Sequence, residues 1–377
     1  MNFGIYIHIP FCDTRCNYCH FITTRLEVGV ADRYCRGLVR ELRAYFATAA
    51  AGGVADSVYF GGGTPSIVSA ELIGGILEAC RELIPFTPDC EITLEANPGT
   101  VTDAKVEAYV EMGINRVSLG AQSFDPQELD LIGRSHTAME IGQSLELLRR
   151  HAIRNVNLDL MLGLPSQTAL HWHSTLQRAV QLDPDHISVY MLDLDGDAPL
   201  SRLIERGVCK VPEDDDVSEW YLATIDFLGA AGFEQYEISN FARPGFQCRH
   251  NLKYWMRNPV LGFGVGSHSH DGASRYANDA SVTDYLEAVE EGRSPVRWKG
   301  SMEKAQELEE TLFLGLRLNR GLDWLKLQQR YSSERLAVTE VFLADMARNG
   351  IVEWQDNIIR LTPRGMLLSN EVFREFV

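Results

Sequence analysis

Strand-like runs alternate with helix-like stretches through the first half of the chain, and this order restricts the possible folds more than any other feature. The runs rich in β-branched and aromatic residues are 5–9, 56–60, 90–96, 115–122, 155–163 and 186–192. The amphipathic stretches between them include 31–50, 69–84, 102–112 and 168–182. Alternating strands and helices form parallel sheets with right-handed crossovers. The sequence therefore predicts an α/β fold, a partial (β/α)6 barrel.

The last part of the chain has a different order. Helical patterns at 308–318, 324–331 and 336–349 precede an alternating hairpin around residues 356–357 and a final helix. This order predicts a mostly helical, winged-helix-like C-terminal domain. We expect a barrel over residues 1–235, a linking segment over 236–300 and a cap over 301–377.

Composition excludes some function classes. The chain has 377 residues, of which 45% are hydrophobic, and a formal net charge of −17 at pH 7. This charge repels nucleic-acid backbones, and the lysines and arginines are dispersed, so we expect no nucleic-acid partner. The acidic run 213–216 is interpreted as a solvated loop before a helix.

Targeting signals are not evident in the sequence. The start lacks a basic leader with a small-residue cleavage site, and no apolar run approaches the roughly 20 residues that a membrane span needs. The 8 cysteines then fit reduced thiols better than a disulfide framework. We expect a cytoplasmic protein whose thiols are free to bind metal.

Polar or glycine-rich segments stand near the ends of the predicted strands. A cysteine loop follows the first strand and residues 61–64 follow the second. Glu95 and Gln122 close the third and fourth strands, and Asp159 lies within the fifth. Because the carboxyl ends of barrel strands share one rim, we expect these groups to converge there.

The cysteine loop has the spacing C-x3-C-x2-C, with Cys12, Cys16 and Cys19. Such a loop can bind three irons of a [4Fe–4S] cluster and leave the fourth iron open to another ligand. The alternative is a structural zinc site, which needs a fourth ligand such as His8 or His20 because structural zinc is closed and tetrahedral. The spacing favours the cluster.

These motifs resemble those of the radical S-adenosylmethionine (SAM) superfamily. "CDTRCNYC" on the first loop is followed by "GGGTP" after the second strand, and "YIHIPFC" is similar to the oxygen-independent coproporphyrinogen III oxidase branch. In that family SAM chelates the open iron of the [4Fe–4S] cluster, and an electron from the cluster cleaves SAM to a 5′-deoxyadenosyl radical. The resemblance therefore implies both cofactors.

The resemblance also implies which residues contact SAM, and it extends through almost the whole chain. The matching positions are Tyr6, Tyr18, Gly62, Gly63, Thr64, Glu95, Gln122, Arg134 and Asp159. A glycine turn lets backbone approach a ligand closely, and Arg134 suits a carboxylate. Each residue alone also fits a structural role: Glu95 and Asp159 could bind backbone amides, and Arg134 could join a surface ion pair.

Two departures separate this chain from the coproporphyrinogen oxidases. Those enzymes carry a fourth cysteine two positions after the third, where this chain has Phe21, and an N-terminal extension, where only five residues precede Tyr6 here. The segment "HNLKYW", residues 250–255, instead resembles the heme chaperone branch, HemW.

The "HNLKYW" segment contains groups that suit heme. The imidazole of His250 can ligate heme iron, and Tyr254 and Trp255 can pack on a porphyrin face. A lone histidine is more often a hydrogen-bonded structural residue. The alternative ligands His268 and His270, in "GFGVGSHSH", and Cys248 remain open.

Two functions are consistent with the sequence. The first is a heme chaperone that binds heme and delivers it to heme-dependent respiratory membrane enzymes, with the cluster and SAM in assembly or regulation. The second is a radical SAM enzyme acting on a porphyrin, such as oxygen-independent coproporphyrinogen III oxidase. The chaperone prediction includes contact with the inner face of the membrane during transfer and leaves a homodimer open.

Overall fold

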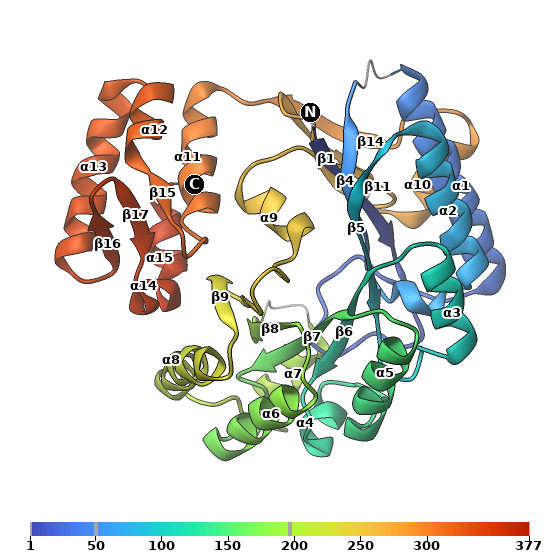
Figure 1. Ribbon diagram of the computed structural model, residues 1–377, viewed down its shortest axis with the longest axis horizontal. Helices are drawn as coiled ribbons and strands as arrows, with labels where there is room; N and C mark the ends of the chain where they lie inside the picture. The colour runs from blue at the N-terminus through green and yellow to red at the C-terminus, as the bar shows by residue number, and fades with distance from the viewer. Residues whose placement is uncertain (1, 49–51, 195–197, 377) are drawn as a thin grey trace.

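A computed structural model describes residues 2–48, 52–194 and 198–376 (Figure 1). Its centre is a curved sheet whose parallel strands follow the predicted order. These strands are β1 (Asn2–Ile9), β4 (Val54–Gly62), β5 (Phe86–Ala96), β6 (Arg116–Gln122), β7 (Asn155–Leu162) and β8 (His186–Met191). The predicted partial barrel of the α/β class is confirmed.

Helices cover the outer face of this sheet (Figure 1). They are α1 (Val28–Thr48), α2 (Ala70–Leu83), α3 (Asp103–Glu111), α5 (Ala138–Arg150), α6 (Ala169–Gln181) and α8 (Asp214–Ala230). Two short helices, α4 (Pro126–Leu131) and α7 (Pro199–Glu205), instead contact the cysteine loop, where Asn17 donates to the Leu131 carbonyl and accepts from the Leu200 amide. The predicted end of the first helix, at residue 50, lies outside the described residues. Two short strands, β2 (Phe11–Cys12) and β3 (Thr24–Arg25), and a 3-10 helix (Pro65–Ile67) lie in the loops.

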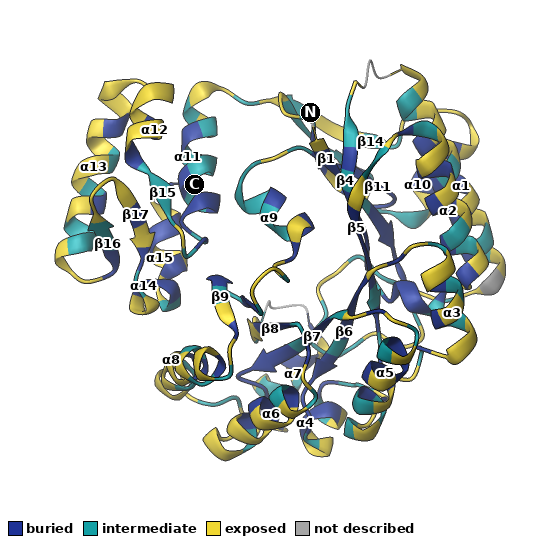
Figure 2. Cartoon of the chain, in the orientation of Figure 1, coloured by how far each residue is buried: buried dark blue, intermediate teal, exposed yellow. Residues whose placement is uncertain are grey.

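The strand pattern divides side chains between a hydrophobic core and the barrel interior. In β1, Ile5, Ile7 and Ile9 are fully buried beneath the helices, whereas Tyr6 and His8 face the other side of the sheet. Figure 2 shows the result: buried strands inside helices whose outer faces are exposed.

Capping residues fix where several helices begin. Thr102 and Thr168 accept hydrogen bonds from backbone amides of α3 and α6, and Thr137 forms a capping box with Glu140 at α5. The acidic run corrects our interpretation, because residues 214–216 form the first turn of α8 rather than a loop. Negative charge at this position interacts favourably with the helix dipole.

The segment 236–300, expected to link two domains, extends the main sheet at both ends. It contains β10 (Asn240–Ala242), α9 (Arg249–Trp255), β11 (Val260–Phe263), β12 (His268–His270), β13 (Ser274–Asn278), α10 (Val282–Glu290) and β14 (Val296–Ser301). Together with β9 (Glu234–Glu237), β10 continues the sheet beyond β8, and β11 pairs in parallel with β1. Within the described residues β9 and β14 are the edges of this open barrel, and α9 lies between the barrel and the C-terminal domain (Figure 1).

The C-terminal domain is mostly helical, as predicted. It contains α11 (Lys304–Gly315), β15 (Leu322–Asp323), α12 (Trp324–Arg330), α13 (Ser333–Arg348), β16 (Val352–Gln355), β17 (Ile358–Leu361), α14 (Pro363–Leu367) and α15 (Ser369–Arg374). The hairpin of β16 and β17 gains β15 as a third strand, and the expected final helix is divided into two at Leu368. Among the described helices, none has both the length and the apolar character needed to cross a membrane.

Candidate cluster and cofactor site

The cysteine loop lies at the carboxyl end of β1, next to the glycine turn that follows β4. Cys12, Cys16 and Cys19 are free thiols and each is partly exposed. The hydroxyl oxygen of Thr64 lies 3.7 Å from Cys12 Sγ, and Arg134 Nη1 donates to Cys16 Sγ at 3.6 Å. Hydrogen-bond donors and positive charge near sulfur stabilise thiolates, which are the form that binds iron. Burial raises the pKa of the Cys12 and Cys19 thiols, and the Thr64 hydroxyl beside Cys12 and the Arg134 guanidinium partly offset this effect. Three thiols with such donors beside them are compatible with an iron–sulfur cluster.

The structure gives less support to the zinc alternative. Among the described residues, no three His, Cys, Asp or Glu side chains converge closely enough to hold one metal ion. His8 cannot contribute without rearrangement, because its Nε2 donates to the Ile22 carbonyl at 3.0 Å and its Nδ1 accepts from the Tyr6 hydroxyl at 3.1 Å. Thiolates that bind different irons of one cluster need not converge on a single point.

The glycine turn approaches the cysteine loop closely. Gly62 has φ +116, and a Cβ there would lie 2.5 Å from His8 Cε1. A Cβ at Gly63 would lie 2.6 Å from the carbonyl oxygen of Phe11, directly before the first cysteine. A side chain at Gly63 would push the two loops apart, and one at Gly62 would meet the His8 ring in an unfavourable backbone conformation, so this turn requires glycine.

Two carboxyl groups face the barrel interior below this turn. Glu95 accepts hydrogen bonds from the Tyr59 hydroxyl (2.8 Å) and from the Gly62 amide (3.1 Å). Burial raises the pKa of Glu95 to about 7. Asp159 accepts from Ser118 at 2.9 Å and from Asn157 at 2.8 Å, and burial also raises its pKa. Such carboxyl groups can accept hydrogen bonds from hydroxyls of a bound molecule.

Arg134 and Gln122 retain buried polar atoms that have no partner among the described residues. Arg134 Nη2 donates to Asn97 Oδ1 at 2.7 Å and to the Gly120 carbonyl at 2.5 Å, whereas its Nε is unpaired. Gln122 adopts φ +59 at an irregularity of β6, and its Oε1 is unpaired. Unpaired buried groups and strained backbone are costly, and both are frequent at ligand sites.

Tyr6 and Tyr18 have different neighbours at the site. Tyr6 is partly buried in the barrel and stacks 6.2 Å from the Tyr59 ring. Tyr18, inside the cysteine loop, packs against an apolar cluster that includes Met161 and Leu164. Among the predicted SAM residues, Thr64 and Arg134 contact the loop cysteines and Glu95 contacts the glycine turn beside them. The assignment of these residues to SAM remains a prediction.

His250 is buried, with 1% of its surface exposed. Its Nδ1 is hydrogen-bonded to Ser57 Oγ at 3.0 Å and its Nε2 to the Tyr254 hydroxyl at 3.2 Å. Burial lowers the pKa of His250 to about 3, so the ring is neutral at ordinary pH. An iron ligand here would have to displace one of these partners.

The other predicted heme residues lie in separate surroundings. Trp255 lies beneath the guanidinium of Arg317, 4.3 Å from its ring centre, and so contacts the C-terminal domain. Cys248 is fully buried with its thiol 3.6 Å from Glu91 Oε1. His270 is buried, whereas His268, at the start of β12, is exposed.

Sequence reasoning missed two residues that organise the site. Tyr59 holds Glu95, and Asn97 joins Thr64 and Arg134 because its Nδ2 donates to Thr64 Oγ1 at 3.2 Å. The position of Tyr59 two residues before Gly61 on an alternating strand was a signal for an inward side chain. Asn97 directly follows the third strand and belonged with the other strand-end groups.

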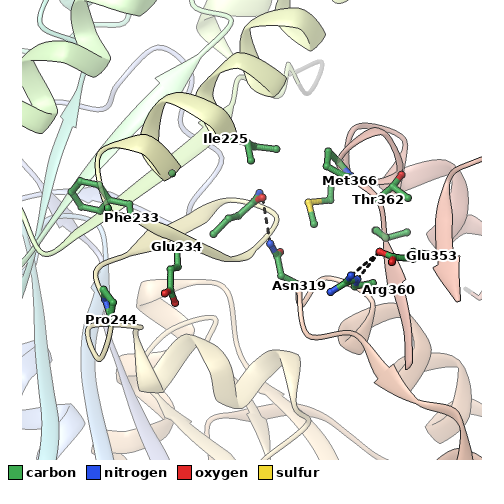
Figure 3. Close-up of a pocket in the computed structure, with 14 residues that line it drawn as sticks. Ile225, Phe233, Glu234, Pro244, Asn319, Glu353, Arg360, Thr362 and Met366 are labelled. Carbon is green, nitrogen blue, oxygen red and sulfur yellow. Dashed lines mark hydrogen bonds and ion pairs between the residues drawn. The ribbon is translucent and has the colours of Figure 1, made fainter. Parts of the chain in front are cut away.

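Three pockets among the described residues exceed about 300 Å³, and one of these, about 470 Å³, is lined mainly by residues of α5. The other two have more aromatic and apolar side chains in their walls. The larger, about 660 Å³, lies between the barrel and the C-terminal domain. Figure 3 shows the residues on its two sides, which include Ile225, Phe233 and Pro244 on one and Glu353, Arg360 and Met366 on the other. The smaller, about 310 Å³, adjoins the cysteine loop and is lined by Tyr6, Phe21, Tyr254 and His268 among others.

Comparisons with known proteins agree with this architecture. The family described as the radical SAM superfamily matches residues 6–179, and the HemN C-terminal domain matches residues 302–368. The fold is similar to that of coproporphyrinogen III oxidase (HemN) from Escherichia coli, with a TM-score of 0.88 and 25% identity over 99% of this chain and 89% of that chain. Fold and site together define a radical SAM protein, a class whose members hold a [4Fe–4S] cluster and SAM.

Full-length relatives identify the branch. The heme chaperone HemW of Bacillus subtilis is 34% identical over 375 residues, which cover 99% of this chain and 98% of that protein. HemW of Synechocystis is 36% identical over 358 residues, covering 93% and 85%. This chain belongs to the HemW family.

Proposed function

We propose that this protein is a heme chaperone, which binds heme and delivers it to heme-dependent respiratory enzymes of the membrane. The observation that carries the proposal is the match, from end to end, to proteins named heme chaperones. The fold alone does not decide between this function and porphyrin chemistry, since the coproporphyrinogen III oxidase HemN has a similar fold. The position of Phe21, where the oxidases have a cysteine, favours the chaperone.

The three loop cysteines, Cys12, Cys16 and Cys19, would hold the [4Fe–4S] cluster. That cluster supplies an electron and an open iron that SAM can ligate. Arg134, whose Nε is unpaired, would bind the carboxylate of SAM, and Gln122 Oε1 would accept one of its hydrogen bonds. We propose that this cofactor site supports assembly or regulation of heme transfer rather than turnover of a porphyrin.

Delivery would involve contact with recipient proteins more than with lipid. The net charge of −17 opposes binding to the anionic inner leaflet. We therefore propose a cytoplasmic chain that meets its recipients at the inner face of the membrane, held there by the recipient itself.

The test is a transfer assay under anaerobic conditions. Heme-loaded protein is mixed with vesicles that contain a heme-free respiratory enzyme, and recipient activity is followed over time. The expected result is activation of the recipient with no decarboxylation when the protein is given coproporphyrinogen III, SAM and reductant. Decarboxylation under those conditions, or failure to bind heme, would refute the proposal.

Two cysteine variants test the assignment of the cluster to the loop. Cys16→Ala should lose bound iron and sulfide, whereas Cys209→Ala, a buried thiol outside the loop, should retain them. Equal iron content in both variants would contradict the assignment.

A further inference from the structure

The pocket beside the cysteine loop contains a histidine and aromatic side chains that together suit heme. Its wall is built from four parts of the chain: the end of β1, the end of the cysteine loop, the C-terminal part of α9, and the turn between β11 and β12 with the first residue of β12. Tyr6 and His8 come from β1, Phe21 and Ile22 from the cysteine loop, Tyr254 from α9 and His268 from the start of β12. Apolar and aromatic walls with few polar groups are typical of small-molecule sites.

Three histidines line this pocket, and they differ in whether a ring nitrogen is free to ligate iron. His8 is buried and both of its ring nitrogens are hydrogen-bonded. His20 is exposed, and its Nε2 donates to the Asp193 carbonyl at 3.3 Å. The ring of His268 is exposed and has no hydrogen bond to any residue the structure describes. A neutral imidazole with a free nitrogen can ligate iron without breaking an existing interaction.

The turn directly before His268 is held by several hydrogen bonds. The Gly264 amide donates to Glu41 Oε2 at 2.9 Å, and the Val265 amide donates to the Tyr34 hydroxyl at 2.9 Å. Ser267 Oγ donates to the Gly264 carbonyl at 2.8 Å, which closes the turn. A ligand residue at the end of such a turn occupies a defined position before heme arrives.

Aromatic surface beside His268 is available for a porphyrin. Phe21 is 67% exposed although it is a large apolar side chain next to the pocket. Together with Ile22 and Tyr254 it forms an apolar and aromatic wall of the kind found in small-molecule sites. The pocket, at about 310 Å³, is at the lower end of the range for ligand sites, so it would cover only part of a porphyrin and leave an edge accessible to a recipient.

His250 and the larger pocket are less suitable for heme iron than His268 and the smaller pocket. His250 does not line the pocket, but it is hydrogen-bonded to the hydroxyl of Tyr254, which does. The larger pocket between the domains is lined by described residues that include no histidine or cysteine (Figure 3). Its one sulfur ligand is the thioether of Met366, whose Sδ already lies 3.7 Å from the Tyr221 hydroxyl, so it offers heme iron no imidazole or thiolate.

We infer that His268 ligates heme iron in the pocket formed by the cysteine loop, α9 and the β11–β12 turn, with Phe21 against the porphyrin, and that His250 acts indirectly by positioning Tyr254. This inference rests on the proposed function. It assigns the "HNLKYW" segment to the wall of the site rather than to the metal.

The experiment is resonance Raman spectroscopy with heme titration on the full-length, cluster-loaded protein, which distinguishes heme ligation from cluster absorbance. His268→Ala should lose the signature of histidine ligation and bind heme at least tenfold more weakly, and added imidazole should restore the signature. His173→Ala, an exposed histidine on α6, is the matched control and should behave as wild type. Because His268 is exposed, the variant should fold and retain its cluster.

The two proposals fail in different ways. If the wild-type protein binds no heme, the proposed function and this inference both fail. If the wild type binds heme and His268→Ala keeps the histidine signature, only the inference fails. Loss of the signature in His20→Ala or His250→Gln, with His268→Ala unaffected, would also overturn it. His250→Gln that binds more weakly with the signature intact would support a positioning role.

Discussion

Replacing Glu41 tests how the turn beside the proposed heme pocket is held, because its carboxyl group binds the Gly264 amide of that turn. Glu41 lies on α1 and is buried. Its Oε2 accepts from the Gly264 amide at 2.9 Å and from the Tyr285 hydroxyl at 2.7 Å, and its Oε1 accepts from Asn278 Nδ2 at 2.6 Å. Burial raises the pKa of Glu41 from 4.5 to about 7, although these hydrogen bonds oppose the change. Replacement by glutamine keeps the shape and removes the ionisation.

The sign of the pH dependence follows from linkage. A carboxyl group whose pKa is higher in the folded protein binds its proton more tightly there, so its protonation stabilises the fold. This contribution is fully present below about pH 4.5 and is lost as the pH rises through about 7. At about 1.4 kcal/mol per pKa unit, the interval from 4.5 to about 7 corresponds to about 3.5 kcal/mol, most of which is lost between about pH 5 and pH 8.

The assay is urea unfolding of the wild type and of Glu41→Gln, each measured at about pH 5 and at about pH 8. Tryptophan fluorescence reports the fraction of unfolded protein. At pH 5 the variant should be less stable by about 1–3 kcal/mol, because its amide group cannot accept from Asn278. At about pH 8 the difference in free energy of unfolding between the two proteins should close or reverse, because only the wild type has lost the stabilisation from a protonated Glu41. Glu95 titrates in both proteins and cancels from the comparison.

The control is Glu82→Gln, which removes an exposed carboxylate on α2. Its difference from wild type should change little between the two pH values. A Glu41→Gln gap that stays constant within about 0.5 kcal/mol would refute the reasoning, because Glu41 would then not change its protonation on unfolding in this range.

Two further substitutions test packing around the site. Gly62→Ala should lower the free energy of unfolding by about 1–3 kcal/mol, because the new Cβ would meet the His8 ring and the φ at this position is +116. Thermal unfolding measures this effect. The control is Gly75→Ala on α2, which places a Cβ in open space and should be neutral or stabilising. Lys253→Met should lower the free energy of unfolding by about 3 kcal/mol, because Lys253 Nζ lies 2.6 Å from Asp56 Oδ1 in a largely buried ion pair. The double variant with Asp56→Asn should recover part of this loss, and additive effects of the two substitutions would contradict the coupling.

The barrel could be predicted because its determinants are local. Each strand is a short apolar run, and threonines such as Thr102 and Thr168 stand where helices begin. The order of strands follows from right-handed crossovers once the alternation is recognised. The same locality explains why the groups at the strand ends, Glu95 and Gln122 among them, could be expected near the cysteine loop.

The segment after the barrel could not be predicted in the same way. Strand β12 has only three residues, and β11 pairs with β1, more than 250 positions earlier in the chain. Short strands with distant partners have no periodic pattern that a local reading can detect. The acidic run at 213–216 was misinterpreted because charge alone does not distinguish a solvated loop from the first turn of a helix.

The "HNLKYW" segment shows why a motif can indicate a family correctly and its chemistry incompletely. Within α9 these neighbouring residues contact three different places: His250 contacts Ser57 inside the barrel, Tyr254 lines the pocket, and Trp255 lies against Arg317 of the C-terminal domain. Because successive helical positions are rotated by about 100°, six consecutive residues cannot all face one ligand. The segment therefore joins the barrel interior, the pocket and the C-terminal domain, and loss of heme on replacing His250 would not by itself identify the iron ligand. That identification needs a signature of the iron itself.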